Sequence, residues 1–282
     1  MTNAQHSRPT VTWHQATVAG AATSFAEIGS GKPVVFLHGW GVSSHAYANA
    51  LRQLAATGLH VYAPCLPGFG GTVPLRNEDV SIAGYARWVR QFCHAAGVAE
   101  PPIVVGHSFG GAIAIRLAYD TPDRVSHLVL INPLGGFRPA KRHASHEPVH
   151  ERSLWEWCRH LAAETCSGHR PATLTAVLHS ALPGLLRNPV AIYRTGQVAR
   201  AVDLSTELAA LRDLDVDISV TWSDGDSLLP ESTFANLRQA LGNPPSMSVP
   251  GPHGWLIDEP HLFTQVVLQA LHLAPTPQRA AA

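Results

Sequence analysis

A serine stands between a short apolar run and a helical pattern, in a context that favours nucleophilic chemistry. Ser108 is the central residue of GHSFG (residues 106–110), a G-x-S-x-G sequence that directly follows the apolar run Ile103–Val105. A sharp strand-to-helix turn strains the serine backbone and requires small neighbours, which the glycines supply. The turn directs the hydroxyl to the sheet edge, beside helix N–H groups that stabilise negative charge. Ser108 is therefore the predicted nucleophile; the alternative is a glycine-rich turn that only packs a helix against a strand.

A second loop predicted at the same edge has the sequence HGWG (residues 38–41) and follows the apolar run Val34–Leu37. Acyl transfer needs two hydrogen-bond donors directed at the developing oxyanion. The backbone N–H groups of Phe109, next to the nucleophile, and of Trp40 are the predicted donors. His38 is expected to hold the loop by hydrogen bonds and not to take part in catalysis.

Serine is a weak nucleophile at neutral pH and needs a base, a role that suits histidine. Among 17 histidines, His253 stands out because it lies in a Gly-Pro-His-Gly loop after the last predicted strand; the alternative is a surface-loop histidine. A carboxylate must orient the imidazole, and in folds with a G-x-S-x-G strand-to-helix turn the chain order is Ser, then Asp or Glu, then His. Asp226 is the predicted acid, and Asp224 is the alternative, which could instead shape the turn. Asn132 is an amide and cannot be the acid.

A parallel sheet would bring these loops together. Apolar runs alternate with helical patterns, which predicts a doubly wound, mostly parallel α/β sheet with right-handed crossovers. The predicted strands are Val11–Val18, Ala21–Ile28, Val34–Leu37, Leu59–Ala63, Ile103–Val105, Val125–Ile131, Ile218–Trp222 and Met247–Val249. The predicted helices are Ser43–Ala56, Ile82–Ala96, Phe109–Tyr119, Glu231–Leu241 and Pro260–Leu273.

The alternation stops after the sixth strand, and a stretch rich in Trp, His and Arg follows. This predicts a helical cap at residues 137–210, inserted into a core made of residues 1–136 and 211–282. Nine Lys and Arg and four Glu lie between Phe137 and Arg200, so the cap is basic. A basic cap could steer an anionic substrate or an acidic carrier protein; a solvated helical face without a ligand is the alternative.

Several cap side chains invite functional interpretation. The expected core of the cap consists of Trp155, Trp157, Leu182, Leu185, Leu186 and Tyr193. Candidate substrate-binding residues among them are Trp155, Leu185 and Tyr193. No metal is expected, because no recognised zinc spacing fits the group His143, His146, His150, Cys158 and His160.

The composition excludes several classes of protein. Lys and Arg together number 20, as do Asp and Glu, so the basic surface of a nucleic-acid-binding protein is absent. The sequence has no apolar run of about 18 residues and no apolar segment near its start, so neither a membrane span nor a signal peptide is predicted. Four cysteines are too few for a disulfide framework. These observations predict a cytoplasmic globular protein.

From about Val11 to Leu273 the chain resembles the α/β-hydrolase family. The motifs that carry the resemblance, in order, are HGWG at 38–41, LPGFG at 66–70, GHSFGG at 106–111, Asp226 with Pro230, and His253. The resemblance implies an eight-stranded, mostly parallel sheet flanked by helices with an inserted helical cap. Two residues depart from the family pattern: Cys65 replaces the usual Asp, and Ser223 replaces a common Gly.

The HGWG loop is similar to that of the carboxylesterases that demethylate pimeloyl-carrier methyl esters in biotin synthesis. The resemblance implies that Trp40 and Phe109 of this chain correspond to the residues that supply the oxyanion donors in that group. The resemblance implies a serine carboxylesterase that needs no cofactor and acts on a small-molecule ester, free or linked to a carrier.

Three other functions stay open: a carbon–carbon bond hydrolase acting on ring-cleavage products, a thioesterase or acyltransferase, and a non-catalytic ligand receptor that retains the triad. An epoxide hydrolase or dehalogenase is disfavoured, because those enzymes have Asp at the position of Ser108. The sequence leaves acyl length and oligomeric state open.

Overall fold

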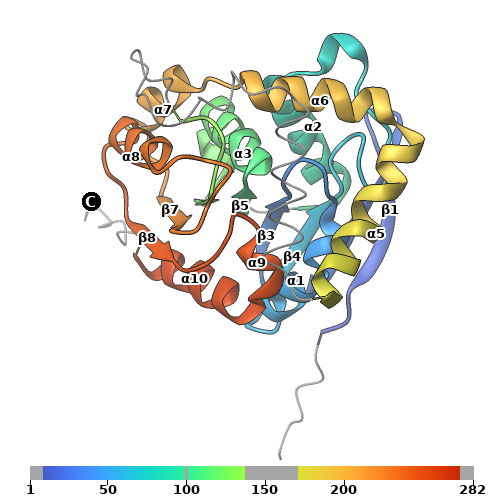
Figure 1. The fold of residues 1–282 in the computed structure, drawn as a ribbon, viewed down its shortest axis with the longest axis horizontal. Coiled ribbons are helices and arrows are strands. Elements are labelled where there is room, and N and C mark those ends of the chain that lie inside the picture. Colours follow the sequence, from blue (N-terminus) through green and yellow to red (C-terminus); the bar gives the residue numbers. More distant parts are fainter. Residues whose placement is uncertain (1–8, 99–100, 137–170, 274–282) are drawn as a thin grey trace, which may run out of the picture.

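The computed structural model describes residues 9–98, 101–136 and 171–273 of the 282-residue chain. The described strands form an eight-stranded sheet in the order β1-β2-β4-β3-β5-β6-β7-β8 (Figure 1). Strand β2 is antiparallel to β1 and β4, and the other pairs are parallel. The strands are β1 Thr12–Val18, β2 Ala21–Gly29, β3 Lys32–Leu37, β4 Leu59–Pro64, β5 Ile103–His107, β6 His127–Ile131, β7 Ile218–Ser223 and β8 Ser246–Val249.

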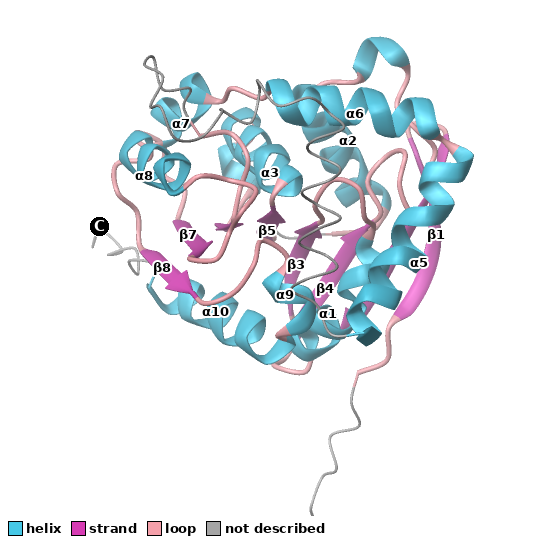
Figure 2. Ribbon diagram, viewed as in Figure 1, coloured by secondary structure: helices cyan, strands magenta, loops and turns pink. Residues whose placement is uncertain are grey.

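Helices cover both faces of the sheet (Figure 2). Strand β3 shows why both faces are covered: Val34 and Phe36 enter one core cluster, Val35 and Leu37 enter the other, and all four are fully buried. Helices α1 and α10 pack on the first face, and α2, α3 and α8 on the second. The helices are α1 Ala48–Ala55, α2 Ile82–Ala95, α3 Phe109–Asp120, α5 Pro171–Arg187, α6 Pro189–Ala201, α7 Ser205–Leu211, α8 Glu231–Ala240, α9 Trp255–Asp258 and α10 Pro260–Leu273, with short 3-10 turns η1 Ser44–Tyr47, η2 Asn77–Asp79 and η3 Pro122–Arg124.

The parallel strands determine where the candidate site lies. Strands β3, β5, β6, β7 and β8 point the same way, so the loops that follow them meet at one edge of the sheet. In the β5–β6 pair, His107 lies opposite Ile131, so Ser108 and Asn132 leave the sheet as neighbours.

The structure confirms the predicted fold class: an eight-stranded, mostly parallel sheet between helices, with a helical insert. The predicted helix Ser43–Ala56 differs in detail, because it starts as the 3-10 turn η1 and continues as α1. The side chain of Ser44 donates to the carbonyl of Pro64 at 2.8 Å and ties this turn to the end of β4.

The described part of the predicted cap is helical and consists of α5, α6 and α7. Residues 137–170, and with them Trp155, Trp157 and the His/Cys group considered for metal binding, lie outside the described residues. Helix α7 packs against α3 and α8 of the core. The division into core and cap at residues 137–210 stays a prediction.

One expectation about the cap is wrong. The inner side of α5 is formed by buried Val177, Ser180 and Gly184, and not by its leucines. Gly184 faces α6 and the loop after β4: a Cβ added there would lie 3.4 Å from Ile192 of α6 and 3.7 Å from the carbonyl oxygen of Gly68. The expected cap-core residues Leu182, Leu185, Leu186 and Tyr193 are instead 52–72% exposed.

Candidate active site

Ser108 lies at the turn from β5 to α3 in a backbone conformation that is rare for residues other than glycine, with φ 53° and ψ −116°. Its N–H donates to the carbonyl of Ile131 at 3.0 Å, and its carbonyl accepts from the N–H of Leu134 at 3.0 Å. These bonds to residues at and after the end of β6 help to hold the strained turn. The turn also depends on Gly110, where a Cβ would lie 2.1 Å from the carbonyl oxygen of Leu37 in β3.

The loop after β3 runs beside Ser108. A Cβ added at Gly39 would lie 3.5 Å from the Cβ of Ser108. On the other side of the serine, Phe109 is the first residue of α3, where a backbone N–H has no acceptor within the helix. The two predicted oxyanion donors, Trp40 and Phe109, therefore belong to segments that both adjoin Ser108.

His38 is fully buried and holds the loop after β3. Its Nε2 accepts from the N–H of Leu66 at 2.8 Å, so its Nδ1 carries the proton and donates to the carbonyl of Gly39 at 2.8 Å. Burial lowers the pKa of His38 to about 4. A neutral side chain with both ring nitrogens bonded to backbone fits the structural role expected for this residue.

His253 and Asp226 form a buried pair. The two residues come from the loops after β8 and β7, and Nδ1 of His253 lies 2.7 Å from Oδ2 of Asp226. The side chains are 7% and 1% exposed. The carboxylate accepts a hydrogen bond from Nδ1–H of His253, so the lone pair of the neutral ring lies on Nε2. The alternative acid, Asp224, is exposed.

The carboxylate of Asp226 has further hydrogen bonds that hold its charge. Its Oδ1 accepts from the backbone N–H groups of Leu228 and Leu229, both at 2.9 Å, and its Oδ2 accepts from the side-chain amide of Asn132 at 2.7 Å. Burial by itself would raise the pKa of this carboxyl, but His253, the backbone N–H of Leu229 and Asn132 together lower it. Asp226 is therefore ionised at neutral pH.

Asn132 has a supporting part that the sequence analysis did not assign. Its amide nitrogen also donates to Oγ of Ser223 at 2.8 Å, and its Oδ1 accepts from the indole N–H of Trp255 at 3.2 Å. Its φ of 42° is in the left-handed region, which asparagine tolerates better than most residues. The side chain that was excluded as an acid is thus a direct partner of the acid.

A second unassigned contact joins the three loops of the site. Nε2 of His107 donates to the carbonyl of His253 at 3.0 Å, so its Nδ1 accepts from the hydroxyl of Tyr47 at 2.9 Å. The same hydroxyl accepts from the N–H of Gly39 at 3.4 Å. Burial, and then the nearby His253, lower the pKa of His107 to about 3 and keep the ring neutral. The network connects the loop of Trp40, the turn of Ser108 and the loop of His253.

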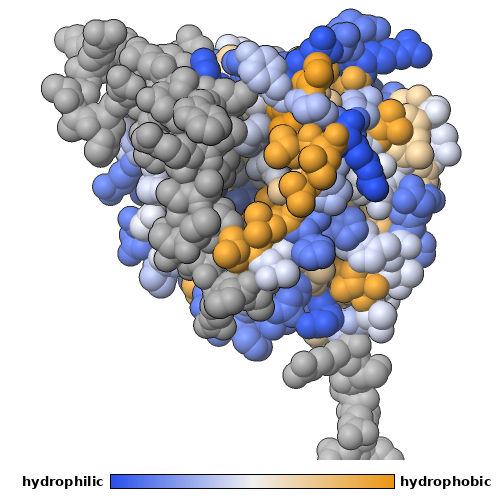
Figure 3. Space-filling model, turned by 45° about the vertical axis from the view of Figure 1, so that its right-hand side comes forward, coloured by the Kyte–Doolittle hydropathy of each residue, from blue (hydrophilic) through white to orange (hydrophobic). Residues whose placement is uncertain are grey.

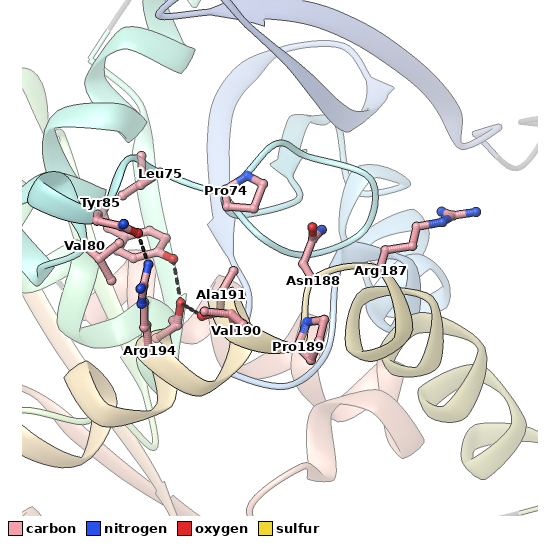
Figure 4. A pocket seen from close by; sticks show the side chains of 12 residues that line it. Pro74, Leu75, Val80, Tyr85, Arg187, Asn188, Pro189, Val190, Ala191 and Arg194 are labelled. Atoms are coloured by element: carbon pink, nitrogen blue, oxygen red, sulfur yellow. Dashed lines mark hydrogen bonds between the residues drawn. The ribbon is translucent and has the colours of Figure 1, made fainter.

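Of the candidate substrate-binding residues, Leu185 and Tyr193 are 52% and 55% exposed and lie on the outer side of the insert. Their exposure gives no support to a buried pocket lined by these two residues. A cavity of about 290 Å³ lies beneath α6, against the chain segment around Leu75 and Val80 (Figure 4). Ser108, Asp226 and His253 are not among its lining residues.

The chain belongs to the α/β-hydrolase fold family, whose model matches residues 32–261. Over 127 residues it is 34% identical to the soluble epoxide hydrolase of Corynebacterium sp. (strain C12), a match that covers 45% of this chain and 43% of that protein. Over 113 residues it is 34% identical to the haloalkane dehalogenase of Mycobacterium marinum, covering 40% and 37% of the two chains. The chain thus spans less than half the length of these two relatives.

Among solved structures, the chain is similar to a thermophilic esterase from Thermogutta terrifontis, with a TM-score of 0.73 and 18% identity over 94% of this chain and 100% of that one. At this identity the likeness concerns the fold. The family model, which matches residues 32–261, shows that the protein is a member of a hydrolase family. Within the parts of the chain that the structure describes, no helix is long and apolar enough to cross a membrane.

Proposed function

We propose that the protein hydrolyses carboxylic esters through an acyl-enzyme, with Ser108 as nucleophile, His253 as general base and Asp226 as the supporting acid. The observation that carries the proposal is the buried 2.7 Å hydrogen bond between His253 and Asp226. The carbonyl of His253 also accepts a hydrogen bond from His107, the residue directly before the strained Ser108. A carboxylate that fixes the tautomer of a histidine beside such a serine is the arrangement that serine hydrolysis needs.

In the proposed reaction, Nε2 of His253 takes the proton of Ser108 as Oγ attacks the ester carbonyl. The backbone N–H groups of Trp40 and Phe109 stabilise the oxyanion, at about 3–4 kcal/mol of barrier each. The protonated His253 then gives the proton to the leaving alcohol. A water molecule, deprotonated by the same ring, hydrolyses the acyl-enzyme and regenerates Ser108.

We do not propose epoxide hydrolysis or dehalogenation, although relatives with these activities are similar to this chain. Both reactions use an Asp nucleophile at the strand-to-helix turn, and this chain has Ser108 there. A serine forms an acyl-enzyme from an ester but not the alkyl-ester intermediate that an Asp forms. Ester hydrolysis is therefore the reaction class to test first.

The test is hydrolysis of p-nitrophenyl esters from acetate to laurate by the wild-type protein and Ser108→Ala. Multiple turnovers are expected for the wild type, with kcat reduced by a factor on the order of 10⁴ or more in the variant. In Asp226→Asn, kcat should fall by a factor on the order of 10⁴, because the amide disfavours the required tautomer of His253. A fluorophosphonate probe should add once, at Ser108, as read by mass spectrometry.

Ser126→Ala is the matched control, because Ser126 precedes β6 and so lies at the opposite end of the strand from Asn132. It should keep wild-type turnover. The proposal fails if Ser108→Ala retains activity, if the probe labels another residue, or if the wild type neither turns over nor reacts.

Within ester hydrolysis, we propose pimeloyl-carrier methyl esters as a specific substrate class, because the HGWG loop at residues 38–41 resembles that of enzymes with this activity. Methanol release from a pimeloyl methyl ester, free and carrier-linked, measures it. Turnover of p-nitrophenyl esters without methanol release would limit the proposal to the general esterase.

A further inference from the structure

A band of apolar side chains lies on the outside of α5 and α6. Figure 3 shows it as a diagonal hydrophobic stripe on the face that carries these helices. We call it the apolar band, and its members are Leu178, Leu182, Leu185, Leu186, Val190 and Tyr193, each 52–72% exposed. A contiguous exposed patch of large apolar side chains marks a contact surface on most proteins.

The polarity of α5 is inverted relative to a surface helix of a globular protein. Such a helix normally turns its leucines to the core and its polar residues to water. In α5 the core side carries the small residues Val177, Ser180 and Gly184, and the leucines at 178, 182, 185 and 186 face outward at helical spacing. Packing of α5 against the rest of the described chain therefore does not account for these four leucines.

The charged residues of α5 and α6 themselves have one sign. Residues 171–201 contain Arg187, Arg194 and Arg200 and no Asp or Glu. The other described residues contain nine Lys and Arg against 15 Asp and Glu. Arg187 and Arg194 are exposed, and in Figure 4 the side chain of Arg187 extends away from the cavity toward solvent. Helices α5 and α6, which carry the apolar band, are thus positive, whereas the rest of the described chain has an excess of acidic residues.

We propose that the apolar band docks on an anionic lipid surface. Interfacial membrane binding uses helices that lie along the membrane surface and carry exposed leucines, aromatic residues and flanking arginines. The apolar side chains enter the acyl boundary, and the cations contact lipid headgroups. An acidic carrier protein would use the arginines but leaves the exposed leucines unexplained. A second copy of this chain would place like charges opposite each other.

The docked face is connected to the candidate site. Helix α6 carries Val190 and Tyr193 on its outer side, while the carbonyl of Ile192 accepts from the indole N–H of Trp40 at 3.2 Å on its inner side. A lipid surface held against α5 and α6 would therefore lie one helix away from the loop that contains a predicted oxyanion donor. Docking does not depend on the proposed esterase activity, and its test needs no turnover.

The experiment is co-sedimentation of the full-length protein with vesicles of phosphatidylcholine alone and of phosphatidylcholine mixed with phosphatidylglycerol. The wild type should bind the mixed vesicles at least about tenfold more tightly, and added salt should weaken this preference. Leu186→Glu should reduce binding to mixed vesicles at least about tenfold. Arg187→Glu should reduce the preference for phosphatidylglycerol.

Leu214→Glu is the matched control, because Leu214 is exposed to 37% and lies outside α5 and α6. It should bind as the wild type does, and thermal melts should show that all variants fold. The proposal is overturned if the wild type binds neither vesicle, or if Leu186→Glu and Leu214→Glu weaken binding equally. It is also overturned if Leu186→Glu instead dissociates a dimer in gel filtration or abolishes binding of an acidic carrier protein while vesicle binding is unchanged.

Discussion

At the scale of single residues, the candidate site includes buried side chains that hold its loops by hydrogen bonds but take no part in the proposed reaction. Tyr47 and His107 connect the loop of Gly39 to the carbonyl of His253, and both side chains are buried. A shift of one loop would pass to the other through these two hydrogen bonds. We expect them to be positioning residues, because their hydrogen bonds join the loop of the proposed base to the loop of a proposed oxyanion donor.

Tyr47→Phe tests this role. The variant removes the hydroxyl shared by Gly39 and His107, so the loops lose a common anchor while the ring still fills its site. We expect kcat on a p-nitrophenyl ester to fall about tenfold with KM changed less than about twofold, and the free energy of unfolding to fall by about 1 kcal/mol. Steady-state kinetics and urea unfolding measure the two effects.

Tyr62→Phe is the control, because the hydroxyl of Tyr62 contacts His60 within β4, at 3.3 Å. It should leave kcat unchanged. Equal losses of kcat in the two variants would show that the effect is general and that Tyr47 does not position the site.

At the scale of elements, the close approach of α3 to β3 determines where the serine turn sits. Gly110→Ala should push these elements apart, because the new Cβ would lie 2.1 Å from the carbonyl oxygen of Leu37. A clash with backbone cannot be relieved by a side-chain rotation, so we expect a loss of about 1–3 kcal/mol in unfolding free energy and a large loss of turnover. Denaturant unfolding and the ester assay measure both.

Gly184→Ala is the matched substitution, in α5. There the new Cβ would meet Ile192 at 3.4 Å, an ordinary contact, and alanine favours the helix by about 0.5–1 kcal/mol over glycine. This variant should be as stable as the wild type or more stable. If Gly110→Ala were equally harmless, the close approach would not limit the position of α3.

At the scale of the whole molecule, buried histidines should make stability depend on pH. The pKa values of His38 and His107 are lowered by burial to about 4 and about 3, from an unfolded value of 6.5. Between these limits the unfolded chain binds protons that the native protein does not, so the free energy of unfolding falls as the pH drops below 6.5. At pH 5 each of these two histidines should lower the free energy of unfolding by about 2 kcal/mol relative to its value at neutral pH.

Urea unfolding at pH 7 and pH 5 measures this loss. His38→Gln should reduce the difference in the free energy of unfolding between the two pH values, because one of the buried histidines with a lowered pKa no longer titrates. His94→Gln, at an exposed position of α2, is the control and should leave the difference as in the wild type. A wild-type free energy of unfolding that is higher at pH 5 than at pH 7 would contradict the expectation.

The sequence by itself determined the fold class and the loops of the candidate site. A short apolar run bounded by turn residues, such as Val34–Leu37, suits a strand buried on both faces, and the loops that follow parallel strands share one edge of the sheet. The motifs around Ser108 and His253 could therefore be assigned to that edge without coordinates. The catalytic roles proposed for them are predictions for the experiments above.

Only the tertiary structure decided which residues support these groups and what the insert exposes. Asn132 and Asp226, and likewise Tyr47 and His107, are far apart in the chain, and no local pattern encodes such contacts. Leu182, Leu185 and Leu186 of α5 are predicted from the sequence to lie inside the cap, and helical apolar spacing does show that a helix has an apolar side. Spacing does not show which side meets the protein, since that depends on what packs against it, and here small residues pack inward.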